Sequence, residues 1–138
     1  MTGREFEKLV EEGLSAVPEK FVRLLKNVAI VIAEEPTPKQ RKTAGLRADE
    51  TLLGLYEGIP QTRRNGGYAG VLPDKITIFR KPILEAALRQ AQGKLQREDV
   101  VREIVRDTVW HEIAHHFGME EDEVSRAEER RLPRSMLH

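Results

Sequence analysis

The sequence predicts an α+β fold in which a small β-sheet is packed by about four to five helices. Several stretches repeat apolar residues at helical spacing, three short segments have the composition of strands, and one helical stretch carries a histidine motif. The chain has 138 residues, no internal repeat and no linker-like segment. Residues 1–138 are therefore expected to form a single domain.

The first elements follow from apolar spacing and from residues that cap helices. A helix is expected over about residues 3–17, because Thr2 and Glu5 are spaced as a capping box ahead of one apolar stripe. This stripe consists of Phe6, Leu9, Val10, Leu14 and Val17. Pro18 ends the helix and can open a short second one. Residues 28–33 are apolar throughout and are predicted to form a buried strand.

The middle of the chain is predicted to contain a loop and two strands. Residues 36–50 are polar, contain two prolines and are expected to form a long surface loop. Its basic cluster (Lys39, Arg41 and Lys42) has no interleaved aromatic residue, so a solvated loop is favoured over a nucleic-acid or anion site. Residues 52–59 and 75–80 are predicted strands, separated by a glycine-rich connection over residues 65–70.

The C-terminal half is predicted to be helical. One helix is expected over residues 82–92, with Gly93 as its stop, and a longer helix from about residue 98 to residue 118. A charged helix is expected over roughly residues 121–131. On the long helix one predicted face is apolar and consists of Val101, Val105, Val109 and Ile113. The neighbouring face consists of Ile104, Thr108, His111 and His115, so this second face can border the core.

Composition and charge exclude several classes of partner. Lys and Arg number 23 and Asp and Glu also number 23, so no net charge steers the chain toward nucleic acid or a membrane. The N-terminus lacks an apolar targeting segment and no apolar run approaches a membrane span, so a cytoplasmic location is expected. Charged residues form 33% of the chain and Asn is scarce, a bias typical of proteins from hot environments. Because Cys is absent, any metal must be held by His and carboxylate side chains.

Residues 111–115 read His-Glu-Ile-Ala-His and form the most informative segment of the chain. On a helix, His111 and His115 stand one turn apart on one face, and the carboxylate of Glu112 projects beside them. Two imidazoles in this arrangement can bind Zn²⁺, and the neighbouring carboxylate can act as a general base toward water. We therefore predict that His111 and His115 are metal ligands and that Glu112 is the catalytic residue.

A catalytic zinc site needs a third protein ligand, which is expected after the motif. Gly118 can end the helix and turn the chain back, so that Glu121 faces the metal and becomes the leading third ligand. The neighbouring Asp122 is an alternative, as are Glu128 and Glu129 from the predicted last helix. Acidic residues also favour the start of a helix without any metal, and this role for Glu121 is equally compatible with the sequence.

Two other residues of the motif helix, His116 and Trp110, are expected to have structural roles. His116 lies about 140° around the helix from His111, so it is expected to pack or to form a hydrogen bond rather than to bind metal. Trp110 is expected to belong to the core.

Three segments of the chain together resemble a known superfamily, the zincins, and within it the bacterial mini-zincin family of minimal metallopeptidase-like domains. They are LGLYEG at residues 53–58, GVLPDKIT at residues 70–77 and HEIAHHFG at residues 111–118. The resemblance covers about residues 20–125, and the last segment is its most specific part. It implies a zincin-like fold with a small mixed sheet, zinc bound by His111, His115 and the residue at position 121, and Glu112 as general base.

The leading functional hypothesis is a zinc-dependent metallopeptidase that acts on a peptide or protein substrate. Zn²⁺ is the expected cofactor, and the protein as isolated need not retain it. The alternative is a degenerate zincin without catalytic activity that acts as a binding or regulatory module. A weaker third idea, a toxin-antitoxin or regulatory partner protein, rests only on the small size and the basic segment. The sequence does not predict the oligomeric state.

Overall fold

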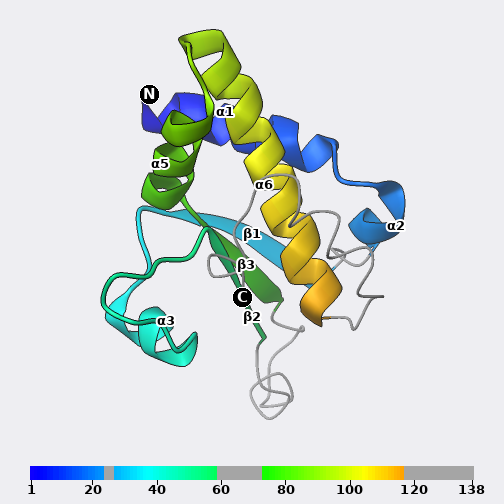
Figure 1. The fold of residues 1–138 in the computed structure, drawn as a ribbon. Helices are drawn as coiled ribbons and strands as arrows, with labels where there is room; N and C mark the ends of the chain where they lie inside the picture. Colours follow the sequence, from blue (N-terminus) through cyan, green and yellow to red (C-terminus); the bar gives the residue numbers. More distant parts are fainter. Residues whose placement is uncertain (24–26, 59–72, 117–138) are drawn as a thin grey trace.

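A computed structural model describes residues 1–23, 27–58 and 73–116 (Figure 1). Its elements occur in the order α1 (Gly3–Ser15), α2 (Glu19–Val22), β1 (Val28–Ala33), α3 (Pro38–Thr43), β2 (Gly54–Glu57), β3 (Asp74–Phe79), α5 (Arg80–Gln90) and α6 (Lys94–His116). The predicted α+β fold is confirmed. The predicted helix over residues 121–131 and the glycine-rich connection over residues 65–70 lie outside the described residues.

The three described strands form one mixed sheet in the order β1-β3-β2. β1 runs parallel to β3, with Ile30 opposite Ile76, and β2 runs antiparallel to β3, with Tyr56 also opposite Ile76. β1 therefore lies at an edge of this sheet. The prediction that this strand is buried was wrong in its extent, because most of its residues are only partly buried and Val31 is 40% exposed.

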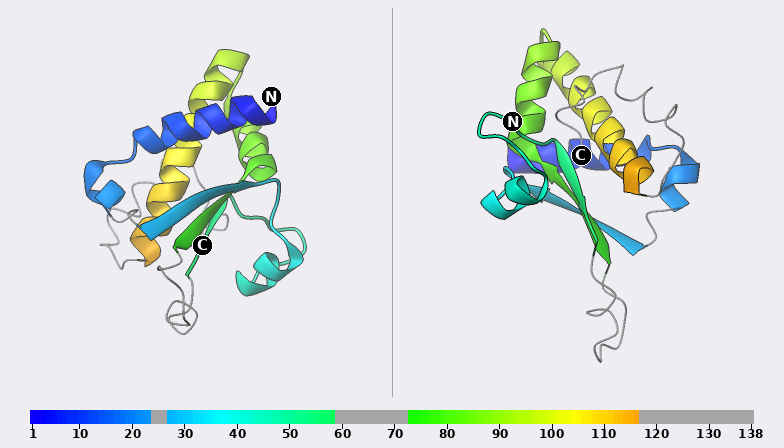
Figure 2. Two further views of the ribbon diagram at one scale, coloured as in Figure 1. Left: turned by 180° about the vertical axis from the view of Figure 1, so that it is seen from behind. Right: turned by 60° about the horizontal axis from the view of Figure 1, so that its bottom comes forward.

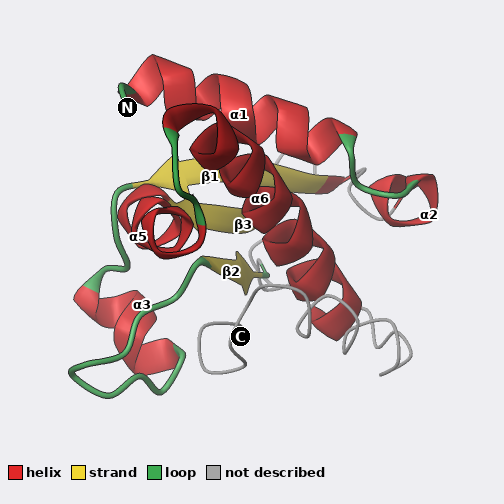
Figure 3. Ribbon diagram, turned by 45° about the horizontal axis from the view of Figure 1, so that its top comes forward, coloured by secondary structure: helices red, strands yellow, loops and turns green. Residues whose placement is uncertain are grey.

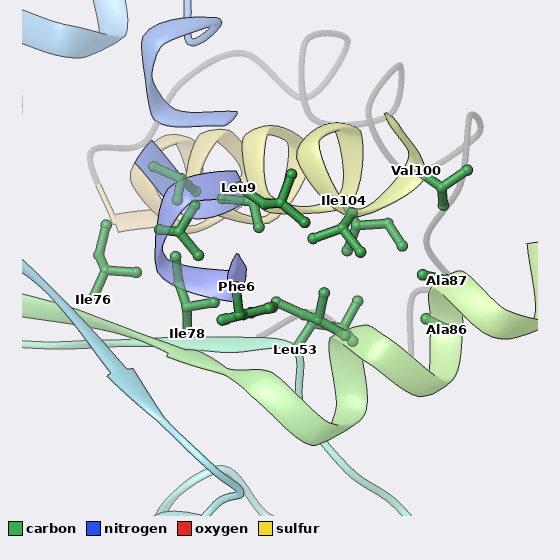
Figure 4. Close-up of a cluster of buried hydrophobic side chains, with 14 of the residues drawn as sticks. Phe6, Leu9, Leu53, Ile76, Ile78, Ala86, Ala87, Val100 and Ile104 are labelled. Carbon is green, nitrogen blue, oxygen red and sulfur yellow. The ribbon is translucent and has the colours of Figure 1, made fainter. Parts of the chain in front are cut away.

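Helices α1, α5 and α6 cover one face of the sheet (Figures 1 and 3). Because side chains alternate along a strand, Ile76 and Ile78 of β3 point toward these helices, and they form the main core with residues from all three. Figure 4 labels part of this core, including Phe6 and Leu9 of α1 and Ile104 of α6. The apolar stripe predicted for α1 is confirmed, since Phe6, Leu9, Val10 and Val17 are buried and Leu14 packs against the same core.

α3 lies on the side of the sheet that is opposite to α6 (Figure 2, right). The face of the sheet on this side carries a smaller apolar cluster. Its buried residues are Leu52, Leu55 and Phe79, and Ala33, Ala44 and Leu46 pack against them. Here the structure corrects the prediction of a loop over residues 36–50, because Pro38–Thr43 is helical. The sequence contained the reason: Thr37 and Gln40 form a capping box, and Pro38 is tolerated in the first turn of a helix.

The basic cluster on α3 takes part in the local structure. The guanidinium of Arg41 donates hydrogen bonds to the carbonyl oxygens of Arg47 and Ala48, at 2.9 and 3.2 Å. Arg41 therefore closes the segment that follows α3, and the side chains of Lys39 and Lys42 are exposed. This agrees with the expectation of a solvated surface segment.

Helix α6 lies at the centre of the helical layer and positions the histidine motif. It begins at Lys94, earlier than predicted, whereas α5 ends at Gln90, two residues before the predicted end. Both predicted faces of α6 are buried along most of their length because α1, α5 and the sheet all pack against it. Within the described part of the chain, no helix has the length and apolar character that a membrane span requires.

Two glycines allow α6 to approach its neighbours closely. A Cβ atom added to Gly13 of α1 would lie 2.8 Å from the carbonyl oxygen of Arg102. A Cβ atom added to Gly54 of β2 would lie 2.6 Å from Cγ2 of Thr108. The second contact brings β2 against α6 one turn before His111, so it fixes how the motif lies relative to the sheet.

Candidate metal centre

His111 and His115 lie on the last two described turns of α6, and the structure brings their rings together. The ring centroids are 4.4 Å apart, with an angle of 32° between the ring planes. His111 is only 1% exposed, whereas His115 is exposed. The pair therefore has one ring within the core and one ring at the surface, as expected for two positions one helical turn apart at the edge of a buried face.

The carboxylate-bearing residue between them, Glu112, is 1% exposed and lines a pocket. This pocket has a volume of about 430 Å³ and is lined by Tyr56, Glu112, His115 and His116. Withdrawing a carboxylate from bulk water is costly unless polar partners satisfy it. A buried carboxylate at the wall of a pocket is therefore a candidate for a functional site. The predicted base and the second imidazole thus share one cavity.

Among the described residues, Tyr56 of β2 and His116 of α6 also line the pocket. The ring of Tyr56 stacks on the ring of His116, with centroids 3.8 Å apart and an angle of 13° between the planes. The hydroxyl of Tyr56 donates a hydrogen bond of 2.7 Å to Oδ2 of Asp74. The prediction that His116 packs is confirmed, and Trp110 packs against the main core, as was also predicted.

A buried acidic residue lies one helical turn before His111. Asp107 is fully buried, and its Oδ1 accepts hydrogen bonds from Nε and Nη2 of Arg106, at 3.1 and 3.0 Å. Asp107 and His111 are four residues apart on α6, so their side chains project from the same side of the helix. Thr108 is also buried on this side.

Sequence reasoning did not single out Tyr56, Asp74 or Asp107. Tyr56 and Asp74 come together because β2 and β3 pair in one register, which no residue pattern within either strand defines. Asp107 borders the face of Ile104, Thr108, His111 and His115, which is not apolar throughout, so its burial was not predictable from the sequence.

The residues present have the donor chemistry of a zinc site as far as the described chain extends. Two imidazoles from one helical turn are preferred zinc ligands, and a carboxylate beside them is typical of hydrolytic sites. The candidates for a third ligand, Glu121, Asp122, Glu128 and Glu129, lie outside the described residues. Within residues 1–23, 27–58 and 73–116, no group of three or more His, Cys, Asp or Glu could hold a metal ion.

A model of the zincin-like metallopeptidase family matches residues 25–131. The matched range includes the whole sheet and the His111–Glu112–His115 motif, and it also includes position 121. No curated protein matches the chain.

Proposed function

The chain belongs to the zincin-like metallopeptidase family, and from this premise we propose that it hydrolyses peptide bonds with the help of Zn²⁺. In this proposal His111 and His115 hold the metal together with Glu121, and Asp122, Glu128 or Glu129 are the alternatives for the third position. Glu112 is the general base. The observation that supports the proposal most strongly is the placement of Glu112 and His115 in one pocket, with the His111 ring 4.4 Å from the His115 ring.

The residues of α6 have distinct roles in the proposed reaction. A bound Zn²⁺ would supply Lewis acidity, which lowers the pKa of water toward about 7 and polarises a peptide carbonyl. Glu112 accepts the proton of the attacking water and passes it to the leaving amine. Because Glu112 is 1% exposed, bulk water competes little for its carboxylate, and the proton transfer stays within the pocket. His111 is buried, so packing rather than solvent determines where its ring lies.

The substrate is proposed to be an extended peptide that pairs with β2. Among the described strands β2 pairs only with β3, so its other edge can accept hydrogen bonds from a peptide backbone. β2 is favoured over β1, the other edge strand, because Tyr56 of β2 lines the pocket with Glu112. A peptide on β2 would therefore place a scissile bond near the proposed base.

The test begins with the zinc content of protein purified without chelator and after zinc reconstitution. Cleavage of casein and of a peptide library is then measured for the wild type, Glu112→Gln and the control Glu85→Gln, which makes the same change at an exposed position on α5. Loss of a general base is expected to reduce the cleavage rate by about 100- to 10,000-fold. Glu112→Gln should retain zinc, and Glu85→Gln should behave as the wild type.

The same measurements distinguish the alternative function. If zinc binds but wild type and Glu112→Gln cleave equally, hydrolysis does not depend on Glu112. If zinc does not bind even on reconstitution, the chain is better described as a degenerate zincin that serves as a binding module.

A further inference from the structure

Tyr56 connects three elements at the rim of the proposed site. Its hydroxyl contacts Asp74 at the start of β3, and its ring lies flat on His116 at the end of the described part of α6. In the register of the sheet Tyr56 is opposite Ile76, so Asp74 occupies the diagonal position that a long side chain can reach. The ring of Tyr56 is therefore held at one end by the sheet and offers its face to the helix.

The stack on His116 lies at the last described turn of α6, far from the other close contact between β2 and α6. About two helical turns closer to the N-terminus of α6, Thr108 packs closely against Gly54 of β2. The stack of Tyr56 on His116 is a second contact between the same two elements, two helical turns later, and His115 lies next to it.

We propose that Asp74, Tyr56 and His116 are positioning residues that hold the His115 turn of α6 against β2. This inference rests on the proposed function in one respect. The contact between Tyr56 and His116 would fix the distance between the imidazole of His115 and the edge of β2 that would carry the peptide. Tyr56 acts through its ring rather than as a proton donor to substrate. Its hydroxyl has one proton, and that proton is used in the hydrogen bond to Asp74.

The first test measures backbone amide exchange over residues 112–116 in the metal-free chain. Tyr56→Leu removes the stacked ring, and we expect exchange in this segment to become about 3- to 10-fold faster. Tyr56→Phe and Asp74→Asn keep the ring but remove or weaken the hydrogen bond that holds it. We therefore expect exchange over residues 112–116 to become about 2- to 5-fold faster in each variant. The control is Phe79→Leu, which makes a matching change from an aromatic residue to Leu in the cluster on the opposite face of the sheet. Phe79→Leu should not accelerate amide exchange in residues 112–116 more than in the rest of the chain.

The second test separates packing from chemistry at His116. His116→Phe retains a flat ring that can stack on Tyr56, whereas His116→Ala does not. Zinc affinity, measured by competition with a chelator, is expected to fall by about 3- to 10-fold in His116→Ala and to stay near the wild-type value in His116→Phe. Equal losses in both variants would show that the imidazole acts chemically, which would overturn the positioning role.

The two proposals fail in different ways. Unchanged amide exchange over residues 112–116 in Tyr56→Leu would overturn the anchor even if the wild type binds zinc and cleaves peptides. A wild type that binds no zinc would contradict the proposed function, whereas faster exchange in Tyr56→Leu would still support the anchor because that measurement needs no metal.

Discussion

Substitution of Gly54 by Ala tests how closely β2 and α6 must approach. The added Cβ atom would lie 2.6 Å from Cγ2 of Thr108 and 3.3 Å from the carbonyl oxygen of Thr77. Carbon atoms in contact prefer about 3.5–4.0 Å, so the first overlap is about 1 Å. β2 cannot simply retreat, because Gly54 is paired with Ile78 in the sheet. We expect α6 to shift away from β2.

The size of this overlap determines how much the free energy of unfolding is expected to fall. Forcing an extra methyl group into a packed interface costs about 1–3 kcal/mol, so we expect Gly54→Ala to lower the free energy of unfolding by about 2 kcal/mol. Thr108→Ala removes the atom that collides and leaves a small cavity, which alone costs about 1 kcal/mol. In the double variant the collision is absent, so its destabilisation should be smaller than the sum of the two single effects.

The assay is urea unfolding of the wild type, both single variants and the double variant under one set of conditions. We expect a coupling of about 1–2 kcal/mol between the two positions. Additive effects, within about 0.5 kcal/mol, would refute the reasoning that Thr108 and Gly54 define the distance between β2 and α6.

Three further predictions concern other parts of the fold. Gly13→Ala should lower the free energy of unfolding by about 2–3 kcal/mol in urea, because the obstacle is the backbone oxygen of Arg102 and cannot rotate away; a neutral effect would contradict the close helix crossing. A hydrogen bond with Glu12 raises the pKa of the Arg102 guanidinium, and Glu12→Gln should cost about 0.5 kcal/mol at low salt and less at high salt; a loss that does not depend on salt would argue against an ion pair. A hydrogen bond from the backbone amide of Arg47 lowers the pKa of Glu50, so any stability it gives is present above the unfolded pKa and disappears as pH falls through the folded pKa. A carboxyl titration by NMR that gives Glu50 an ordinary or raised pKa would disprove this.

The helices that carry long apolar stripes were predictable from sequence, because their spacing determines which face is buried. The stripe of α1 and the apolar face of α6 are both buried as expected. The extent of burial in β1 was not predictable, because an apolar run cannot reveal that its strand lies at an edge of the sheet. α3 was not predicted because this six-residue helix has no buried apolar stripe, and its sequence signal is limited to the capping box of Thr37 and Gln40 and the proline in its first turn.

One part of the candidate site was likewise predictable from the sequence, and another part was not. The spacing of His111 and His115 predicts that they share a helical face, and their rings are indeed adjacent. The contribution of Tyr56 depends on the register between β2 and β3 and on the crossing of α6 over the sheet, which are properties of tertiary packing. The part played by Glu121 stays a prediction.

The central claim, that His111 and His115 hold one zinc ion, is tested most directly by X-ray absorption at the zinc edge on the zinc-loaded chain. We predict one zinc per chain, a first shell that contains two imidazole nitrogens and carboxylate oxygen, and loss of this signal in His111→Ala and in His115→Ala. A shell without imidazole, or one that is identical in wild type and both variants, would contradict the claim.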